Sequence, residues 1–360
     1  KANTGHPGAP MGMADIAEVL WTGYLKYNPS NPDWADRDRF VLSKAHASPV
    51  LYTVLAQCGY FPREDLWTFR KIDSLLQGHA HMMTPGVEMS GGSVGNTMAA
   101  LASLGGTGSY IGKVRDDQLG GIFHHDLESL GITFSTAQAL DSSPTARCLI
   151  IVTPDGQRSM ATYLGACVEL GPEDIDADTI QSHRVTYLEG YLWDAPQAKE
   201  AMIKAAQLAH DTGCQVALTL SDPFCVDRHR DSFRDLILNH VDILFANEQE
   251  IISLYQEERV HAALERGRGE CKLVVVTRSA EGSLIATSDM IHKVDAVPVE
   301  RVVDTTGAGD LYAAGFLFGV THGYSTPASG CIGAIAASEI ISHVGARPEA
   351  DLRELVQRTL

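Results

Sequence analysis

Apolar and polar positions follow two different periods along the chain from about Arg147 onward. Short, continuously apolar runs, typical of buried strands, occur at 147–153, 184–189, 215–220, 242–246 and 272–277. Between them, residues 196–210 and 231–240 carry apolar side chains at helical spacing. Short buried strands that alternate with helices predict a mainly parallel sheet covered by helices on both faces.

The two ends of the chain carry different patterns. Residues 308–323 and 329–345 are helix candidates rich in small residues, which suits close packing. Near the start, residues 11–27 are amphipathic, 38–44 suggest a short strand, and 48–61 suggest a helix. No flexible linker or charge run separates this first part from the rest, so its boundary has to come from motifs.

Composition and charge narrow the classes of function. The 360 residues fit one large α/β domain or two smaller ones, and a net charge of −17 argues against nucleic-acid or anionic-membrane partners. No apolar run approaches the roughly 20 residues of a membrane span. The seven cysteines are scattered singly, which predicts neither a zinc site nor a disulfide framework and suits a reducing cytoplasm.

The stretch DTTGAGD at 304–310 carries candidate chemistry. Gly307 and Gly309 permit backbone N–H groups to converge at the start of a helix, which forms an anion site. Asp310 beside that site could accept a proton from a hydroxyl that attacks phosphorus. A simple strand-to-helix turn stays open as an alternative. A dinucleotide fingerprint is excluded because Tyr312 occupies its third glycine position, and a Walker loop lacks its Gly-Lys-Ser/Thr.

A second glycine motif lies roughly 210 residues earlier, in SGGSVGN at 90–96. Gly91 and Gly92 would let a ligand approach the backbone, and Asn96 offers a donor and acceptors to a sugar hydroxyl. Together the two motifs resemble the paired signatures of the ribokinase-like (PfkB) family of carbohydrate and nucleoside kinases. From about Ser90 to the end, stretches such as GKVRDDQLGGIF, ILFANEQE and VVVTRSAEGS resemble the adenosine-kinase-like branch.

This resemblance implies a three-layer α/β/α sandwich with a small lid, and transfer of the γ-phosphoryl group of ATP to a hydroxymethyl group. It implies the following roles: Asp310 as catalytic base; Gly307, Ala308 and Gly309 as anion hole; Arg158 on the transferring phosphate; Gly91, Gly92 and Asn96 on the substrate; Asn247 and Glu250 on Mg²⁺ through water; Thr277, Gly282 and Thr305 on ATP.

Several of these residues also have a structural interpretation, which stays open. Asn247 and Glu250 would cap the helix that follows them. Arg158 would be a solvated turn residue. Thr277 and Gly282 would form the turn of a hairpin between the strand at 272–277 and SLIAT at 283–287.

The first 89 residues instead resemble the start of transketolase, especially its split-subunit form, in KANTGHPGAPMGMADIAEVLW and LQGHAHMMTPGVEMS. The resemblance implies that His6, His46 and His79 match histidines lining the thiamine diphosphate channel. However, the usual S-K-G-H reads Ser43-Lys44-Ala45-His46 here, and the G-D-G…N magnesium motif is absent. We therefore expect no thiamine diphosphate binding.

The sequence thus predicts a chimera, with a transketolase-like fragment at 1–89 and a ribokinase-like domain at 90–360. We expect that domain to lack its first strand, its substrate-binding aspartate and much of its lid. The expected chemistry is ATP- and Mg²⁺-dependent phosphorylation of a small sugar or nucleoside, with weak turnover and partly retained ATP binding. The alternatives are a non-catalytic nucleotide-binding remnant, a partner-binding chain and, from another class, a thiamine diphosphate enzyme.

Overall fold

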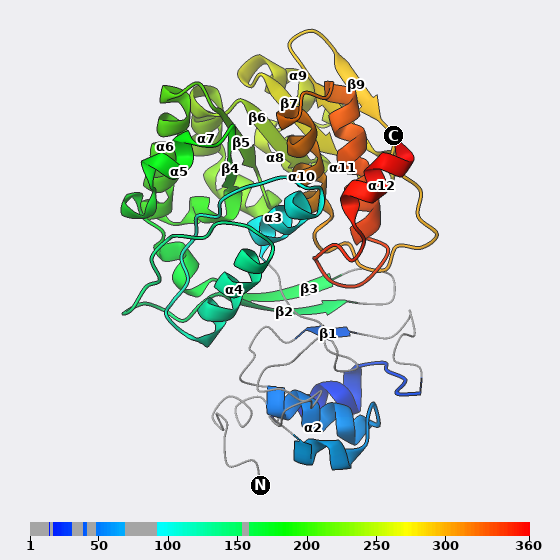
Figure 1. The fold of residues 1–360 in the computed structure, drawn as a ribbon. Coiled ribbons are helices and arrows are strands. Elements are labelled where there is room, and N and C mark those ends of the chain that lie inside the picture. The colour runs from blue at the N-terminus through cyan, green and yellow to red at the C-terminus, as the bar shows by residue number, and fades with distance from the viewer. Residues whose placement is uncertain (1–13, 15–16, 31–38, 42–47, 69–91, 153–157) are drawn as a thin grey trace.

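The molecule consists of a large α/β body, a small antiparallel sheet below it and a helical segment below that sheet, in the view of Figure 1. The computed structural model describes residues 14, 17–30, 39–41, 48–68, 92–152 and 158–360. No helix in these ranges is long and apolar enough to cross a membrane. All seven cysteines lie within them and are free, which agrees with the absence of a disulfide framework.

The body is built on a six-stranded sheet in the order β4-β5-β6-β7-β8-β9. The first four strands are parallel, and β7, β8 and β9 pair antiparallel. Their bounds are Val185–Glu189, Gln215–Thr219, Ile243–Asn247, Leu273–Thr277, Ser283–Ala286 and Ile291–Val294. Four of the five predicted apolar runs are therefore confirmed as strands of this sheet.

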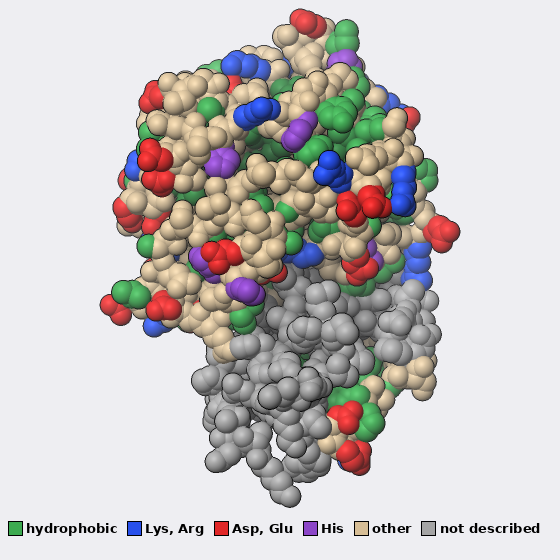
Figure 2. Space-filling model, in the orientation of Figure 1, with side chains coloured by type: hydrophobic (Ala, Val, Ile, Leu, Met, Phe, Trp, Pro, Cys, Tyr) green, Lys and Arg blue, Asp and Glu red, His purple; other side chains and the backbone are tan. Residues whose placement is uncertain are grey.

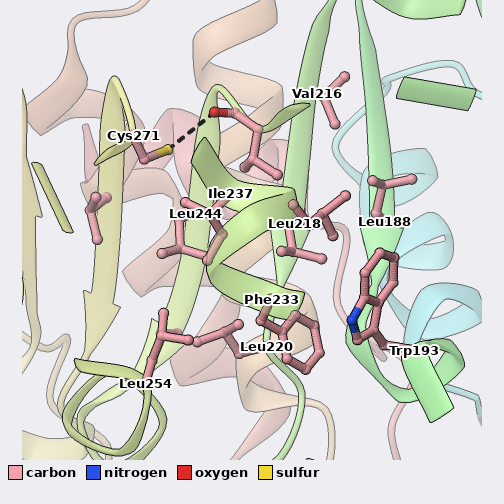
Figure 3. Packing of buried hydrophobic residues seen from close by; sticks show 14 of the residues in the cluster. Leu188, Trp193, Val216, Leu218, Leu220, Phe233, Ile237, Leu244, Leu254 and Cys271 are labelled. Carbon is pink, nitrogen blue, oxygen red and sulfur yellow. Dashed lines mark hydrogen bonds between the residues drawn. The ribbon is translucent and has the colours of Figure 1, made fainter. Parts of the chain in front are cut away.

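Side chains of the sheet alternate between two apolar layers, as the pleat requires. Leu244 and Ala246 of β6 pack in the layer with helices α6 to α9, whereas Ile243 and Phe245 pack in the layer with α10 and α11. The helix bounds are Pro196–Asp211 (α6), Pro223–His240 (α7), Glu248–Tyr255 (α8), Val260–Glu270 (α9), Ala308–Thr321 (α10) and Thr326–Ile340 (α11). Figure 3 shows part of the first layer, where Leu218, Leu244 and Phe233 lie against one another.

Helices α10 and α11 approach each other at glycine positions, which confirms the predicted close packing. A Cβ atom added to Gly315 would lie 2.8 Å from the Cα atom of Gly333, and one on Gly319 would lie 2.5 Å from Ser329 Oγ. These distances are shorter than real Cβ contacts, so only glycine fits without a backbone shift.

Four further helices of the described residues lie around this body. They are α3 (Ser93–Ser103), α4 (Gln118–Ser129), α5 (Ala177–Gln181) and α12 (Leu352–Thr359), with 3₁₀ turns at Gly165–Glu169, Pro172–Asp174, Gly190–Asp194 and Ser279–Glu281. Figure 1 shows α10, α11 and α12 on one side of the sheet and α5, α6 and α7 on the other. The ribokinase-like layered arrangement is thereby confirmed.

The small sheet corrects one prediction. Residues 147–153 were expected in the parallel sheet, but β2 (Arg147–Val152) pairs antiparallel with β3 (Arg158–Tyr163) in a separate three-stranded sheet. The third strand is β1 (Arg39–Val41), which pairs antiparallel with β2. An apolar run of this length does not specify its partner, because either kind of sheet buries it.

The described part of the first segment forms a small core of its own. A π-helical turn at Leu20–Tyr24, helix α2 (Ser48–Cys58) and a 3₁₀ turn at Arg63–Thr68 surround it. Trp21, Tyr52 and Leu55 are buried there together. The short strand and the helix predicted in this part are confirmed as β1 and α2.

On the face of the body that Figure 2 presents, charged side chains are distributed without strong segregation. Figure 2 shows acidic and basic residues interspersed on the face it presents. The net charge of −17 therefore does not arise from a single acidic block on that face.

Candidate active site

The glycine-rich turn before α10 is organised by a buried aspartate. The carboxylate of Asp304, only 2% exposed, accepts hydrogen bonds from the backbone N–H and the hydroxyl of Thr306 at 2.8 and 2.7 Å. Its second oxygen accepts one from the Gly345 N–H at 3.1 Å. Gly307 follows with φ +82°, which favours glycine, and α10 begins at Ala308. The turn thereby presents the first N–H groups of α10 to one side.

Two predicted motifs meet at Asp310, in the first turn of α10. The Ser93 hydroxyl donates to Asp310 Oδ1 at 2.9 Å, and Asn96 Nδ2 donates to Oδ2 at 2.8 Å. Both donors lie in α3, whose N-cap, Gly92, has φ +100°. Because a carboxylate only accepts hydrogen bonds, the amide nitrogen of Asn96 has to face Asp310. The structure therefore joins SGGSVGN to DTTGAGD through these side chains.

The contact changes what Asn96 can offer a ligand. Its side chain is buried, and its donor is engaged by Asp310, whereas Oδ1 has no hydrogen-bond partner among the described residues. A ligand hydroxyl would therefore meet an acceptor at this position, in addition to the carboxylate of Asp310.

Glu189, which sequence reasoning missed, is a second carboxylate near Asp310. It ends β4, is buried, and accepts a hydrogen bond from the Ser221 hydroxyl, while Oε2 has no partner among the described residues. Burial raises the pKa of Glu189 to about 7; the hydrogen bond from Ser221 opposes this shift, and the charge of Asp310 adds to it. Its only sequence signal was an acid directly after an apolar strand.

Asn247 and Glu250 form a capping box at the start of α8. Asn247 Oδ1 accepts from the Glu250 N–H at 2.8 Å, and Glu250 Oε2 accepts from the Asn247 N–H at 2.8 Å. Asn247 Nδ2 also donates to Glu250 Oε1 at 2.6 Å. Burial is the largest cause that raises the pKa of Glu250 to about 7. The charges of Asp222 and Glu189 also raise this pKa, whereas the hydrogen bond from the Asn247 N–H lowers it. The capping interpretation is thus confirmed, and both carboxylate oxygens already accept hydrogen bonds.

Thr277 and Gly282 flank a hairpin turn, as their structural interpretation predicted. The Arg278 N–H donates to the Gly282 carbonyl at 2.8 Å, and β7 and β8 pair antiparallel across the turn. A Cβ atom on Gly282 would lie 2.0 Å from the Val294 carbonyl oxygen, so close packing also requires glycine. Thr277 and Thr305 line the large cavity that also contains Asp310, whereas Gly282 is not among the described residues that line this cavity.

A cavity of about 1920 Å³ contains these groups. Its wall includes the carboxyl ends of the parallel strands, the starts of α3 and α10, and six acidic residues, Asp126, Glu189, Asp222, Glu250, Asp304 and Asp310. Ligands of open α/β sheets bind at this end of the strands. No group of three or more metal-binding side chains occurs among the described residues.

Some predicted residues cannot be placed in this geometry. Arg158 begins β3, but its side chain lies outside the described part of the structure. Gly91, His6, His46 and His79 also lie outside the described residues.

Two family models match the chain. The model for the pfkB family carbohydrate kinases matches residues 73–352, and that for the thiamine diphosphate binding domain of transketolase matches residues 1–110. The two matches overlap at residues 73–110.

Solved structures and curated sequences agree with these matches. The adenosine kinase from Sinorhizobium meliloti is 52% identical with a TM-score of 0.75, covering 77% of this chain and 85% of that one. A structure described as a probable sugar kinase protein from Rhizobium etli CFN 42 is 50% identical with a TM-score of 0.74, covering 76% and 83%. Transketolase 2 of Escherichia coli is 55% identical over 106 residues, 29% of this chain but only 16% of the length of that relative.

Proposed function

This chain belongs to the pfkB family of carbohydrate kinases, and from that premise we propose that it transfers the γ-phosphoryl group of ATP to a hydroxymethyl group of a nucleoside or sugar. The single observation that carries the proposal is the carboxylate of Asp310. It stands at the N-terminus of α10, inside the large cavity, and is held by two donors from α3.

In this proposal Asp310 removes the proton of the acceptor hydroxyl as that oxygen attacks phosphorus. Ser93 and Asn96 donate to the two oxygens of Asp310, which orients the carboxylate. Gly307, Ala308 and Gly309 would stabilise charge on the transferring group through the N–H groups of the first turn of α10. Arg158 would contribute a positive charge.

The acidic cavity fits a cation that accompanies the phosphates. Mg²⁺ keeps several waters and takes few protein carboxylates, so Asn247 and Glu250 would hold it through water without breaking their capping box. When bound, the ion would supply charge neutralisation at the phosphates. Thr277 and Thr305, which line the cavity, would contact ATP.

The domain boundaries also belong to this proposal. Residues 90–360 would form the kinase unit, and 1–89 a transketolase-derived segment that serves it structurally. The pairing of β1 with β2 supports this role, because β1 extends the small sheet beside the body. The chain carries too little of the transketolase length to support thiamine diphosphate chemistry as a second candidate.

The test is MgATP-dependent phosphorylation of a panel of nucleosides and sugars, with Asp310→Asn measured in parallel. We expect low turnover by the wild type, and a loss of kcat of about 10²–10⁴-fold in the variant because the general base is removed. Asp231→Asn, an exposed acid of α7, is the matched control and should keep full activity.

Two outcomes would contradict the proposal. Activity that survives in Asp310→Asn would remove Asp310 from the chemistry. Absence of turnover in the folded wild type, with a melting temperature still raised by MgATP, would identify a nucleotide-binding remnant.

A further inference from the structure

A slot runs along the edge of β4 with which no strand of the described residues pairs, and we propose that it binds an extended apolar segment of another polypeptide as an added β-strand. The cavity that holds the candidate active site continues along this edge, where residues 184–189 line it without interruption. Residues 105–114 also line it without interruption. This inference concerns binding and stands independently of the kinase proposal.

The backbone of β4 has an open side. The Gln215 N–H donates to the Arg184 carbonyl at 3.0 Å, and β4 runs parallel to β5 with Val185 opposite Gln215. In such a ladder the N–H and C=O groups of alternate residues face the same neighbour. Those of Val185 and Tyr187 therefore point away from β5, and no described residue hydrogen-bonds to them.

The segment that contains Ser109 has an open side too. The Tyr110 N–H donates to the Thr133 carbonyl at 2.7 Å, and the Thr133 N–H donates to the Gly108 carbonyl at 3.2 Å. The backbone groups of Ser109 therefore point away from Thr133. A hydrogen bond of 3.2 Å between Ser109 Oγ and His183 Nε2 joins this segment to the residue that precedes Arg184 and β4.

Two backbone edges with no partner among the described residues thus line one cavity, which is the arrangement that an inserted strand satisfies on both sides. Adding a strand to an open edge is a recurrent mode of peptide binding, in which main-chain hydrogen bonds supply affinity. Here both sides of the added strand would be paired.

The residues that line the slot restrict the sequence of a peptide segment that could bind in it. Met202 and Ala205 of α6 line the slot on one face of the sheet, and Leu317 of α10 lines it on the other. A strand between two apolar layers has to be apolar at every position, and β4 sets its length at five residues.

The two ends of the slot differ in charge. His183 and Arg184 lie where β4 begins, whereas Glu189 and Asp310 line the cavity where it ends. Because the four strands β4 to β7 pair parallel, we assign an occupant that also runs parallel to β4. The end charges then place an acidic residue before its apolar run and hydroxyl or basic residues after it.

The probe is a synthetic peptide, Glu-Val-Ile-Val-Ile-Val-Gly-Ser-Lys, added to the full chain. Amide hydrogen exchange read residue by residue by NMR reports occupancy. We expect exchange at Val185, Tyr187 and Ser109 to slow at least about tenfold, because their N–H groups gain acceptors. Thr186 and Leu188, which already face β5, should change little.

Two control peptides need no change in the protein. Proline in place of the central Val removes a backbone donor and should abolish the protection. The reversed sequence tests direction and should bind at least about tenfold more weakly. Binding without protection of the three amides, or equal binding of the proline peptide, would overturn the proposal. So would full protection in the chain alone, whether as monomer or as dimer by light scattering, because the slot would then be filled by this chain or a second copy.

Discussion

Glu189 and Glu250 are two carboxyl groups that the fold removes from water within one cavity. For both, burial is the largest cause of a pKa raised from 4.5 to about 7. Their charges therefore change near neutral pH, where an ordinary glutamate is fully ionised. The cavity becomes less negative as the pH falls through this range, which weakens its attraction for cations.

The raised pKa of Glu189 makes the free energy of unfolding depend on pH. Between pH 4.5 and about 7 the folded chain binds a proton that the unfolded chain releases, so stability falls as the pH rises through this window. Glu189→Gln removes this contribution, which amounts to about 3 kcal/mol at most. Urea unfolding at pH 5 and pH 8 should show a smaller loss of stability in the variant than in the wild type.

The exposed Glu300→Gln serves as the control and should follow the wild-type profile. If the Glu189→Gln curve runs parallel to that of the wild type across the window, the burial of Glu189 does not perturb its protonation.

Among the single residues of the site, those that belong to local sequence motifs could be predicted from the sequence. Those whose role depends on tertiary structure could not. Asp310 and Asn96 stood out because glycines precede each of them at a helix start. Asp304 carried a weaker signal, since an Asp two residues before Thr is typical of an Asx turn. Glu189 could not be assigned, because nothing local shows that the end of β4 lies near α10.

Among the helices, α10 and α11 depend on glycine for their separation. Gly315→Ala places a methyl group 2.8 Å from backbone atoms of α11, so we expect a loss of about 1–3 kcal/mol of stability. Gly269→Ala in α9 is the matched control, since nothing lies within 4 Å of its added Cβ atom. That change should stabilise the chain by about 0.5–1 kcal/mol through helix propensity. Thermal and urea unfolding measure both.

Equal effects of the two substitutions would contradict this account. A neutral Gly315→Ala would mean that the helices move apart without cost, and that small residues on α10 do not set their spacing.

The strands show what periodicity can and cannot predict. Runs at 184–189, 215–220, 242–246 and 272–277 became β4 to β7 because helices between them enforce parallel crossovers. The run at 147–153 looks the same along the chain, yet it enters the small antiparallel sheet. Its neighbour β3 follows after a short connection, and hairpin pairing is the local solution for such a pair.

Across the whole molecule, the first segment is joined to the body by backbone pairing of β1 with β2. Phe40 lies opposite Ile151 in this register. Phe40→Pro should break the pairing, because proline disrupts a strand ladder. We expect faster amide exchange at Ile150 to Val152, and faster proteolytic release of the first segment, while the melting of the body changes little.

Phe40→Val is the control, because a β-branched residue suits a strand and should preserve the pairing. If the proline variant exchanges and cleaves like the wild type, β1 does not hold the two parts together in solution. The sequence could not predict this pairing, since it joins stretches that resemble two different families.

The pairing of β1 with β2 also affects how the chain folds during translation. Arg39 leaves the ribosome more than a hundred residues before Val152, its partner in the sheet. At a translation rate of roughly 5–20 residues per second this interval lasts on the order of 10 s, far longer than a hairpin takes to form. The nascent β1 therefore has an unpaired edge during this interval, while Trp21, Tyr52 and Leu55 of the same segment can already pack together. Slowing the ribosome between these two points would lengthen that exposure and lower the yield of correctly folded chains.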